Sequence, residues 1–132
     1  MIVVDTNVIS YLLITGDFTK EAEAVFRKDP EWAAPLLWRS EFRNVLAFYL
    51  RRNHMLMRQS VDLMEEAEYL MRNREFGVSS ARVLRLTAES GCSAYDCEFV
   101  ALAMDLGFPL VTSDAKVLKA FPRLAFSIDD FA

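Results

Sequence analysis

The chain opens with Met1-Ile2-Val3-Val4-Asp5-Thr6-Asn7-Val8-Ile9, and this stretch decides the fold. Four apolar residues of strand length come first, and after Asp5 the pattern becomes helical. Asp5 is therefore expected at the carboxyl end of a strand. In open parallel α/β sheets, ligands bind in the crevice beyond the carboxyl ends of the strands, so an acid at this place indicates a site as well as a fold.

A second junction of this kind lies near the other end of the chain. Residues 109–112 form an apolar run with β-branched residues, and residues 115–120 again look helical. Asp114 lies between them, in the same kind of position as Asp5. Because the carboxyl ends of adjacent parallel strands face one crevice, we expect these two aspartates to share it.

Two further acids lie within expected helices, on or beside their apolar faces. Glu41 borders the stripe that includes Trp38 and Phe42, and Asp96 shares a face with Phe99 and Val100. Desolvating an unpaired carboxylate costs several kcal/mol, so such a group is neutralised, paired or bound to a cation.

Together the four acids indicate a metal site. Oxygen ligands without His or Cys select Mg²⁺ or Mn²⁺. One or two such ions would activate a water for in-line attack on a phosphodiester. Asp5, Glu41 and Asp96 are the strongest ligand candidates, and Asp114 is expected to bind directly or through water. Side chains expected to orient these carboxylates by hydrogen bonds are Thr6, Asn7, Asn44, Thr112 and Ser113.

Local structure offers another account of the same acids. Asp5 and Asp114 could each cap the helix that follows, and residues 93–96 fit a capping box. Glu41 could pair with a nearby arginine or lie in solvent. Four separate coincidences that give four convergent carboxylates are harder to accept than one site, so we favour the site.

Composition describes one globular domain spanning residues 1–132. Hydrophobic residues make up 53% and charged residues 26% of the sequence, which suits a well-packed core. The longest uncharged stretch, residues 6–16, is too short to cross a bilayer, and no signal peptide is expected. We therefore expect a cytoplasmic protein without membrane contact. Cys92, Cys97 and the single His54 do not make a zinc site.

The net charge of −4 argues against a general nucleic-acid binder, but the charge is unevenly distributed. Residues 39–85 carry nine basic and six acidic side chains, and all nine basic ones are arginines, whose planar fork suits phosphate. Arg39 and Arg43, on either side of Glu41, are the candidate substrate-binding residues. The alternative is that these arginines belong to solvated helix faces.

Strand-like and helical segments alternate along the chain. Strands are expected at residues 1–4, 32–34, 75–78, 109–112 and 125–128. Helices are expected at residues 8–14, 19–28, 35–52, 55–72, 81–89, 94–106 and 115–120. This alternation predicts an α/β fold, with a central, mainly parallel sheet flanked by helices. The helices at 35–52 and 55–72 should form a long hairpin.

At the four acidic positions the sequence resembles the PIN-domain ribonucleases, particularly the small VapC toxins of prokaryotic toxin–antitoxin pairs. The matching segments are residues 4–7, 40–46, 95–103 and 110–118. The resemblance implies a PIN-like fold with a protruding helical hairpin and a Mg²⁺- or Mn²⁺-dependent ribonuclease that acts as a toxin. It also implies an RNA substrate, a cognate VapB-like antitoxin that covers the acidic pocket, and a homodimer.

Two other functions fit the residues less well. One is a non-catalytic PIN-fold interaction module that binds RNA or a basic partner peptide. The other is a phosphatase with an Asp-x-Asp nucleophile motif, but Asn7 occupies the position of the second acid.

Overall fold

Five parallel strands form the centre of the protein in the computed structural model, which describes residues 1–132. Their order across the sheet is β3-β2-β1-β4-β5. The strands are β1 (Ile2–Val4), β2 (Trp32–Pro35), β3 (Glu75–Phe76), β4 (Leu110–Val111) and β5 (Ala125–Phe126). The order runs outward from β1 in both directions, so the sheet reverses its winding between β1 and β4.

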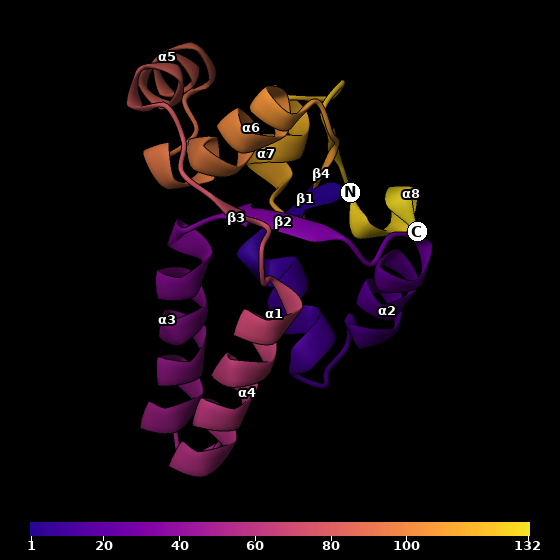
Figure 1. Cartoon of the computed structure of the whole chain (residues 1–132), viewed down its shortest axis with the longest axis vertical. Helices are drawn as coiled ribbons and strands as arrows, with labels where there is room; N and C mark the ends of the chain where they lie inside the picture. Colours follow the sequence, from indigo (N-terminus) through magenta and orange to yellow (C-terminus); the bar gives the residue numbers. More distant parts are fainter.

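Eight helices surround this sheet. They are α1 (Thr6–Leu13), α2 (Thr19–Lys28), α3 (Leu37–Arg51), α4 (Met57–Leu70), α5 (Ser80–Ser90), α6 (Ala94–Leu106), α7 (Ala115–Ala120) and α8 (Ile128–Phe131). Figure 1 shows α5, α6 and α7 on one side of the sheet and α1 to α4 on the other. The pair α3 and α4 extends away from the sheet as a hairpin. None of the eight helices has the length and apolar character needed to cross a membrane.

Helices on both sides explain why the strands are apolar on both faces. Val3, Val4, Ala33 and Val111 are completely buried, because each pleat of the sheet contacts a helix layer. Helix α6 is buried between the sheet and α5, and it carries five consecutive buried residues from Phe99 to Ala103. One core of 28 buried residues joins these layers.

The sequence predicted the order of the five strands and of helices α1 to α7 correctly, but it missed the short helix α8 and misplaced the ends of several elements. Helix α1 begins at Thr6, two residues earlier than expected, because Asp5 caps it. Pro35 ends β2 instead of opening the next helix. The last strand was predicted to include Ile128, which was wrong. It ends at Phe126, because the Ser127 hydroxyl accepts a hydrogen bond from the backbone N–H of Asp130 and starts α8.

Gly107 ends α6 in the left-handed conformation, with φ at 74°, which a residue with a Cβ adopts at a cost. We expect Gly107→Ala to lower the free energy of unfolding by about 1 kcal/mol in urea titrations. The control is Gly77→Ala, because Gly77 has no positive φ and a Cβ there meets no atom within 4 Å. That change should be neutral or slightly stabilising. Equal effects at the two positions would contradict the backbone argument.

Candidate active site

Four acidic side chains from different parts of the chain line one pocket of about 370 Å³. Asp5 directly follows β1 and Asp114 lies just after β4, whereas Glu41 lies on α3 and Asp96 lies in the first turn of α6. The pocket is therefore beyond the carboxyl ends of the two strands between which the sheet reverses, where doubly wound sheets bind their ligands. The structure thus brings together all four acids that the sequence singled out.

Asp5 is held by hydrogen bonds to both of its carboxylate oxygens. The Thr112 hydroxyl donates to Oδ2 over 2.6 Å, and the backbone N–H of Asn7 makes a longer contact of 3.4 Å to Oδ1. Burial nevertheless raises the pKa of Asp5 above its ordinary value, and the charges of Asp96 and Asp114 add to this effect. The hydrogen bonds oppose the shift. Asp5 is therefore held in one orientation, but its hydrogen bonds do not fully offset the cost of burying its negative charge.

Asp114 is tied to the same threonine. Its backbone N–H donates to the Thr112 hydroxyl over 3.0 Å, and its Oδ1 accepts from the backbone N–H of Val117 over 2.9 Å. The second contact caps α7. Thr112 itself is buried, with 1% of its surface exposed, so its hydroxyl holds Asp5 and Asp114 in a fixed relation.

Glu41 is held from α1. The hydroxyl of the buried Thr6 donates to Glu41 Oε1 over 2.8 Å, across 35 residues of sequence. Burial is the largest cause of a raised pKa at Glu41, and the charges of Asp5, Asp96 and Glu98 raise it further. No arginine forms an ion pair with Glu41, so the pairing considered from the sequence is absent.

Asp96 is placed by the start of α6. The Ser93 hydroxyl accepts from the backbone N–H of Asp96 over 3.1 Å and caps the helix. Burial raises the pKa of Asp96, the charge of Asp114 raises it further, and Lys116 opposes both effects. Asp5 and Asp114 therefore cap α1 and α7 and still line the pocket, whereas Ser93 caps α6 without a reciprocal hydrogen bond from the Asp96 side chain. Capping and site formation coexist here instead of excluding one another.

The other predicted polar residues divide into two groups. Thr6, Asn7 and Asn44 line the pocket, whereas Thr112 acts on Asp5 and Asp114 from outside it. Ser113 does not line the pocket, and its hydroxyl shares a hydrogen bond of 3.3 Å with the Tyr11 hydroxyl.

Four lining residues were not proposed as site residues from the sequence: Leu37, Ser40, Val45 and Tyr95. Three of them are found by helical spacing, and the fourth is next to a predicted acid. Leu37 and Val45 lie four residues before and after Glu41, and Ser40 lies four residues before Asn44. Tyr95 directly precedes Asp96.

The family is decided by a direct comparison with known sequence families. The PIN domain model matches residues 2–126, which is nearly the whole chain. The chain belongs to the PIN-domain family. This confirms the resemblance seen at the four acidic motifs, and it confirms the PIN-like α/β fold with its parallel sheet.

Individual relatives agree with this PIN-domain assignment. The chain is 28% identical to the ribonuclease VapC3 of Pyrobaculum aerophilum over 127 residues, which covers 93% of this chain and 96% of that protein. Among solved structures, FitAcB from Neisseria gonorrhoeae superposes with a TM-score of 0.77 at 18% identity, covering 97% of this chain and 98% of that one. PAE2754 from Pyrobaculum aerophilum gives 0.74 at 20% identity, with 96% and 90% covered. The structures share the fold.

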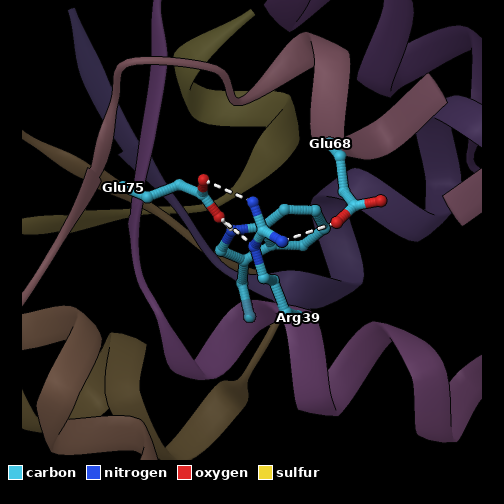
Figure 2. Close-up of polar contacts among 4 residues, drawn as sticks. Arg39, Glu68 and Glu75 are labelled. Atoms are coloured by element: carbon cyan, nitrogen blue, oxygen red, sulfur yellow. Dashed lines mark hydrogen bonds and ion pairs between the residues drawn. The ribbon is translucent and has the colours of Figure 1, made fainter. Parts of the chain in front are cut away.

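The two arginines predicted to bind substrate lie outside the pocket lining of this PIN domain. Figure 2 shows Arg39 of α3 between Glu68 of α4 and Glu75 of β3. Arg39 donates from Nε and Nη2 to the two oxygens of Glu75, over 2.6 and 2.8 Å, and it also pairs with Glu68. It therefore ties both arms of the helical hairpin to the sheet. Arg43 is exposed and unpaired, and its contact with substrate stays a prediction.

Asp5→Asn tests whether the crowded carboxylates destabilise the PIN domain. Burial raises the pKa of Asp5 in the folded state, so ionisation opposes folding, and this penalty grows as pH rises above the ordinary value of 3.8. In EDTA at pH 7 we expect Asp5→Asn to raise the Tm by a few degrees, with no gain below the ordinary pKa. Asp62→Asn, at an exposed position of α4, should change little. A lower Tm for Asp5→Asn at pH 7 would mean that the Thr112 hydrogen bond outweighs the charge.

Arg39→Lys tests the ion-pair network of Figure 2. Lysine cannot make the two-pronged contact with Glu75, so we expect a loss of about 1–2 kcal/mol in the free energy of unfolding, measured with urea at pH 7. Arg43→Lys is the control and should change it by less than about 0.5 kcal/mol.

The stabilisation by the Arg39–Glu75 pair should depend on pH. The hydrogen bond from Arg39 lowers the pKa of Glu75 below 4.5 in the folded state, so the stabilisation is present above 4.5 and is lost as pH falls below it. The difference in the free energy of unfolding between the wild type and Arg39→Lys should therefore become smaller as the pH falls below 4.5. A constant difference, or equal effects of the two Arg→Lys changes, would contradict this role.

Proposed function

We propose that this PIN domain is a Mg²⁺- or Mn²⁺-dependent ribonuclease that hydrolyses RNA phosphodiester bonds, and that it is the toxin of a toxin–antitoxin pair. The observation that carries the proposal is the convergence of four carboxylates, from four different elements, in one pocket at the reversal of the sheet. The relative named as a ribonuclease covers nearly the same length of chain and supports the choice of RNA.

The donor set fits a hard divalent cation. All four charged groups in the pocket are carboxylates, and three of them have pKa values raised by burial and mutual repulsion, which a cation would relieve. No three of them are arranged to ligate one ion together. Mg²⁺ commonly takes one or two carboxylates and keeps several waters, so this spacing suits it. When bound, the ion would supply a Lewis acid that activates water and offsets the charge of the phosphodiester.

The chain's own residues set the positions of these ligands. We assign direct ligation of one or two ions to Asp5, Glu41 and Asp96, with no more than two of these carboxylates on the same ion, and direct or water-mediated contact to Asp114. Hydroxyls of Thr112 and Thr6 hold Asp5 and Glu41 in place, and such supporting hydrogen bonds keep ligating carboxylates in productive orientations.

Two side-chain amides complete the polar lining of the pocket. Asn7 and Asn44 lie beside the acids and have no hydrogen-bonded partner within the protein for their side-chain amides. They can donate to phosphate or ribose oxygens without adding charge to the site.

The proposed partners follow from the charge of the pocket and from the relatives. No lysine or arginine lines the pocket, so it is complementary to a basic segment such as that of a VapB-like antitoxin. A toxin–antitoxin complex from Klebsiella pneumoniae is among the structures that share the fold, with a TM-score of 0.69. We also propose a homodimer and a cytoplasmic location, where RNA and antitoxin would be met.

The second candidate is a non-catalytic module that uses the same acids to bind a basic peptide. The lack of any cation in the pocket lining favours it as much as it favours metal binding. Cleavage of RNA separates the two functions directly.

We expect the purified protein to cut pooled cellular RNA into discrete products with Mg²⁺ or Mn²⁺ and not with EDTA. Loss of a residue that supports a ligand typically reduces activity by about 10–100-fold, and we expect a reduction of this size in the cleavage rate of Thr112→Val. Asp5→Asn, which removes a proposed ligand, should reduce the rate by more than this. Asp62→Asn is the matched control, since it removes an exposed acid that does not line the pocket. Cleavage that survives both EDTA and Asp5→Asn would rule out this site. A folded protein that binds a basic peptide but cuts no RNA would support the module.

A further inference from the structure

Tyr95 is an exposed aromatic residue in the acidic pocket itself. It lines the pocket with the four carboxylates, and 64% of its surface is exposed. Its backbone is fixed, because it lies in the first turn of α6 between the capping Ser93 and Asp96. A large ring is therefore held in the solvent beside the proposed ligands.

The other strongly exposed aromatic rings of the protein are covered by a neighbour. Phe18 packs on Tyr11, with ring centroids 5.0 Å apart. The Arg52 guanidinium lies 3.5 Å from the centre of the Phe48 ring, and that of Arg72 lies 4.6 Å from the centre of the Tyr69 ring.

Tyr95 has no such cover. Its ring pairs with no aromatic or cationic side chain. Phe108 and Phe126 also lack a ring partner, but they are only 37% and 38% exposed and share a different pocket at the far end of α6. Tyr95 is thus the most exposed ring with a free face, and it is the one in the pocket of the acids.

The pocket lining carries no positive charge, and this limits the ways in which it can bind a nucleic acid. No lysine or arginine lines the pocket, and of the two arginines that flank Glu41, Arg39 is engaged by two glutamates and the unpaired Arg43 lies outside the lining. Within the lining, apart from a bound ion, attraction for a nucleic acid must come from uncharged groups, whose apolar members are Leu37, Val45 and Tyr95. Nucleobases are the uncharged, flat part of a nucleic acid, and exposed aromatic rings bind them by stacking.

We propose that Tyr95 stacks on a nucleobase next to the scissile phosphodiester and thereby contributes to substrate binding at this site. The inference rests on the proposed ribonuclease function. In a duplex both faces of each base are already stacked, so the ring of Tyr95 has a partner only in a strand whose bases can turn outward.

The test compares Tyr95→Ala and Tyr95→Phe on one defined single-stranded RNA that the wild type cleaves. Losing one stacked base should raise KM by about tenfold or more, while kcat changes much less. Tyr95→Phe should recover the wild-type KM to within about twofold, because the ring and not the hydroxyl makes the contact. Tyr69→Ala is the control, since Tyr69 is 70% exposed but lies outside the pocket. Thermal unfolding of each variant shows that the fold is kept.

A substrate series identifies the stacked base. Abasic sites are placed one at a time on either side of the cut, and one of them should raise the wild-type KM as much as Tyr95→Ala does. The same abasic site should have no further effect in Tyr95→Ala, which is the signature of two groups that act on each other. The same sequence in a duplex should be cut at least about tenfold more slowly.

The outcomes separate this proposal from the function it rests on. If the wild type cuts RNA in a metal-dependent way but Tyr95→Ala is unchanged, or if duplex is cut equally well, stacking is wrong and the ribonuclease stands. If Tyr95→Ala weakens capture of a partner protein while cleavage is unaffected, the ring is a protein contact and the proposal is overturned. If the wild type cuts no RNA while folded and loaded with metal, the proposed function fails first, and Tyr95 has no base to stack on.

Discussion

The hydroxyl of Thr112 joins the ends of the two strands between which the sheet reverses, and the site depends on this connection. It donates to the Asp5 carboxylate and accepts from the backbone of Asp114, while the backbone N–H of Asp5 donates to the carbonyl of Val111. These hydrogen bonds fix the positions of Asp5 and Asp114 relative to each other. The two acids lie at the carboxyl ends of β1 and β4, the strands between which the sheet reverses its winding. A buried threonine can do this because its single hydroxyl both donates and accepts.

The remaining two acids reach the same point by tertiary packing. Glu41 is oriented by the hydroxyl of Thr6, the first residue of α1. Because Asp5 caps α1, it helps to fix Thr6 and, through Thr6, the carboxylate of Glu41. Asp96 is fixed by a helix that is buried between the sheet and α5. Four carboxylates are thus held close together by the core of the protein, and burial and mutual repulsion raise the pKa values of Asp5, Glu41 and Asp96.

What could be predicted from the sequence was local. The apolar runs before Asp5 and Asp114, the helical stripe beside Glu41 and the cap before Asp96 are each contained in about ten residues, and they located all four acids. What could not be predicted depends on pairs far apart in the chain. Arg39 was a candidate for phosphate, but Glu68 and Glu75, 29 and 36 residues away, engage it instead. The ring of Tyr95 is likewise free because no aromatic or cationic side chain packs on it in the folded protein, and a local sequence pattern cannot predict this.

The outer strands of the sheet, β3 and β5, have only two residues each. A short edge presents few unpaired backbone groups, so it is a poor template for the addition of another strand. This protein is therefore protected against edge-to-edge polymerisation, even though its central strands are entirely apolar. It follows that the helices, and not the edges of the sheet, make up the surface that this protein offers to another chain.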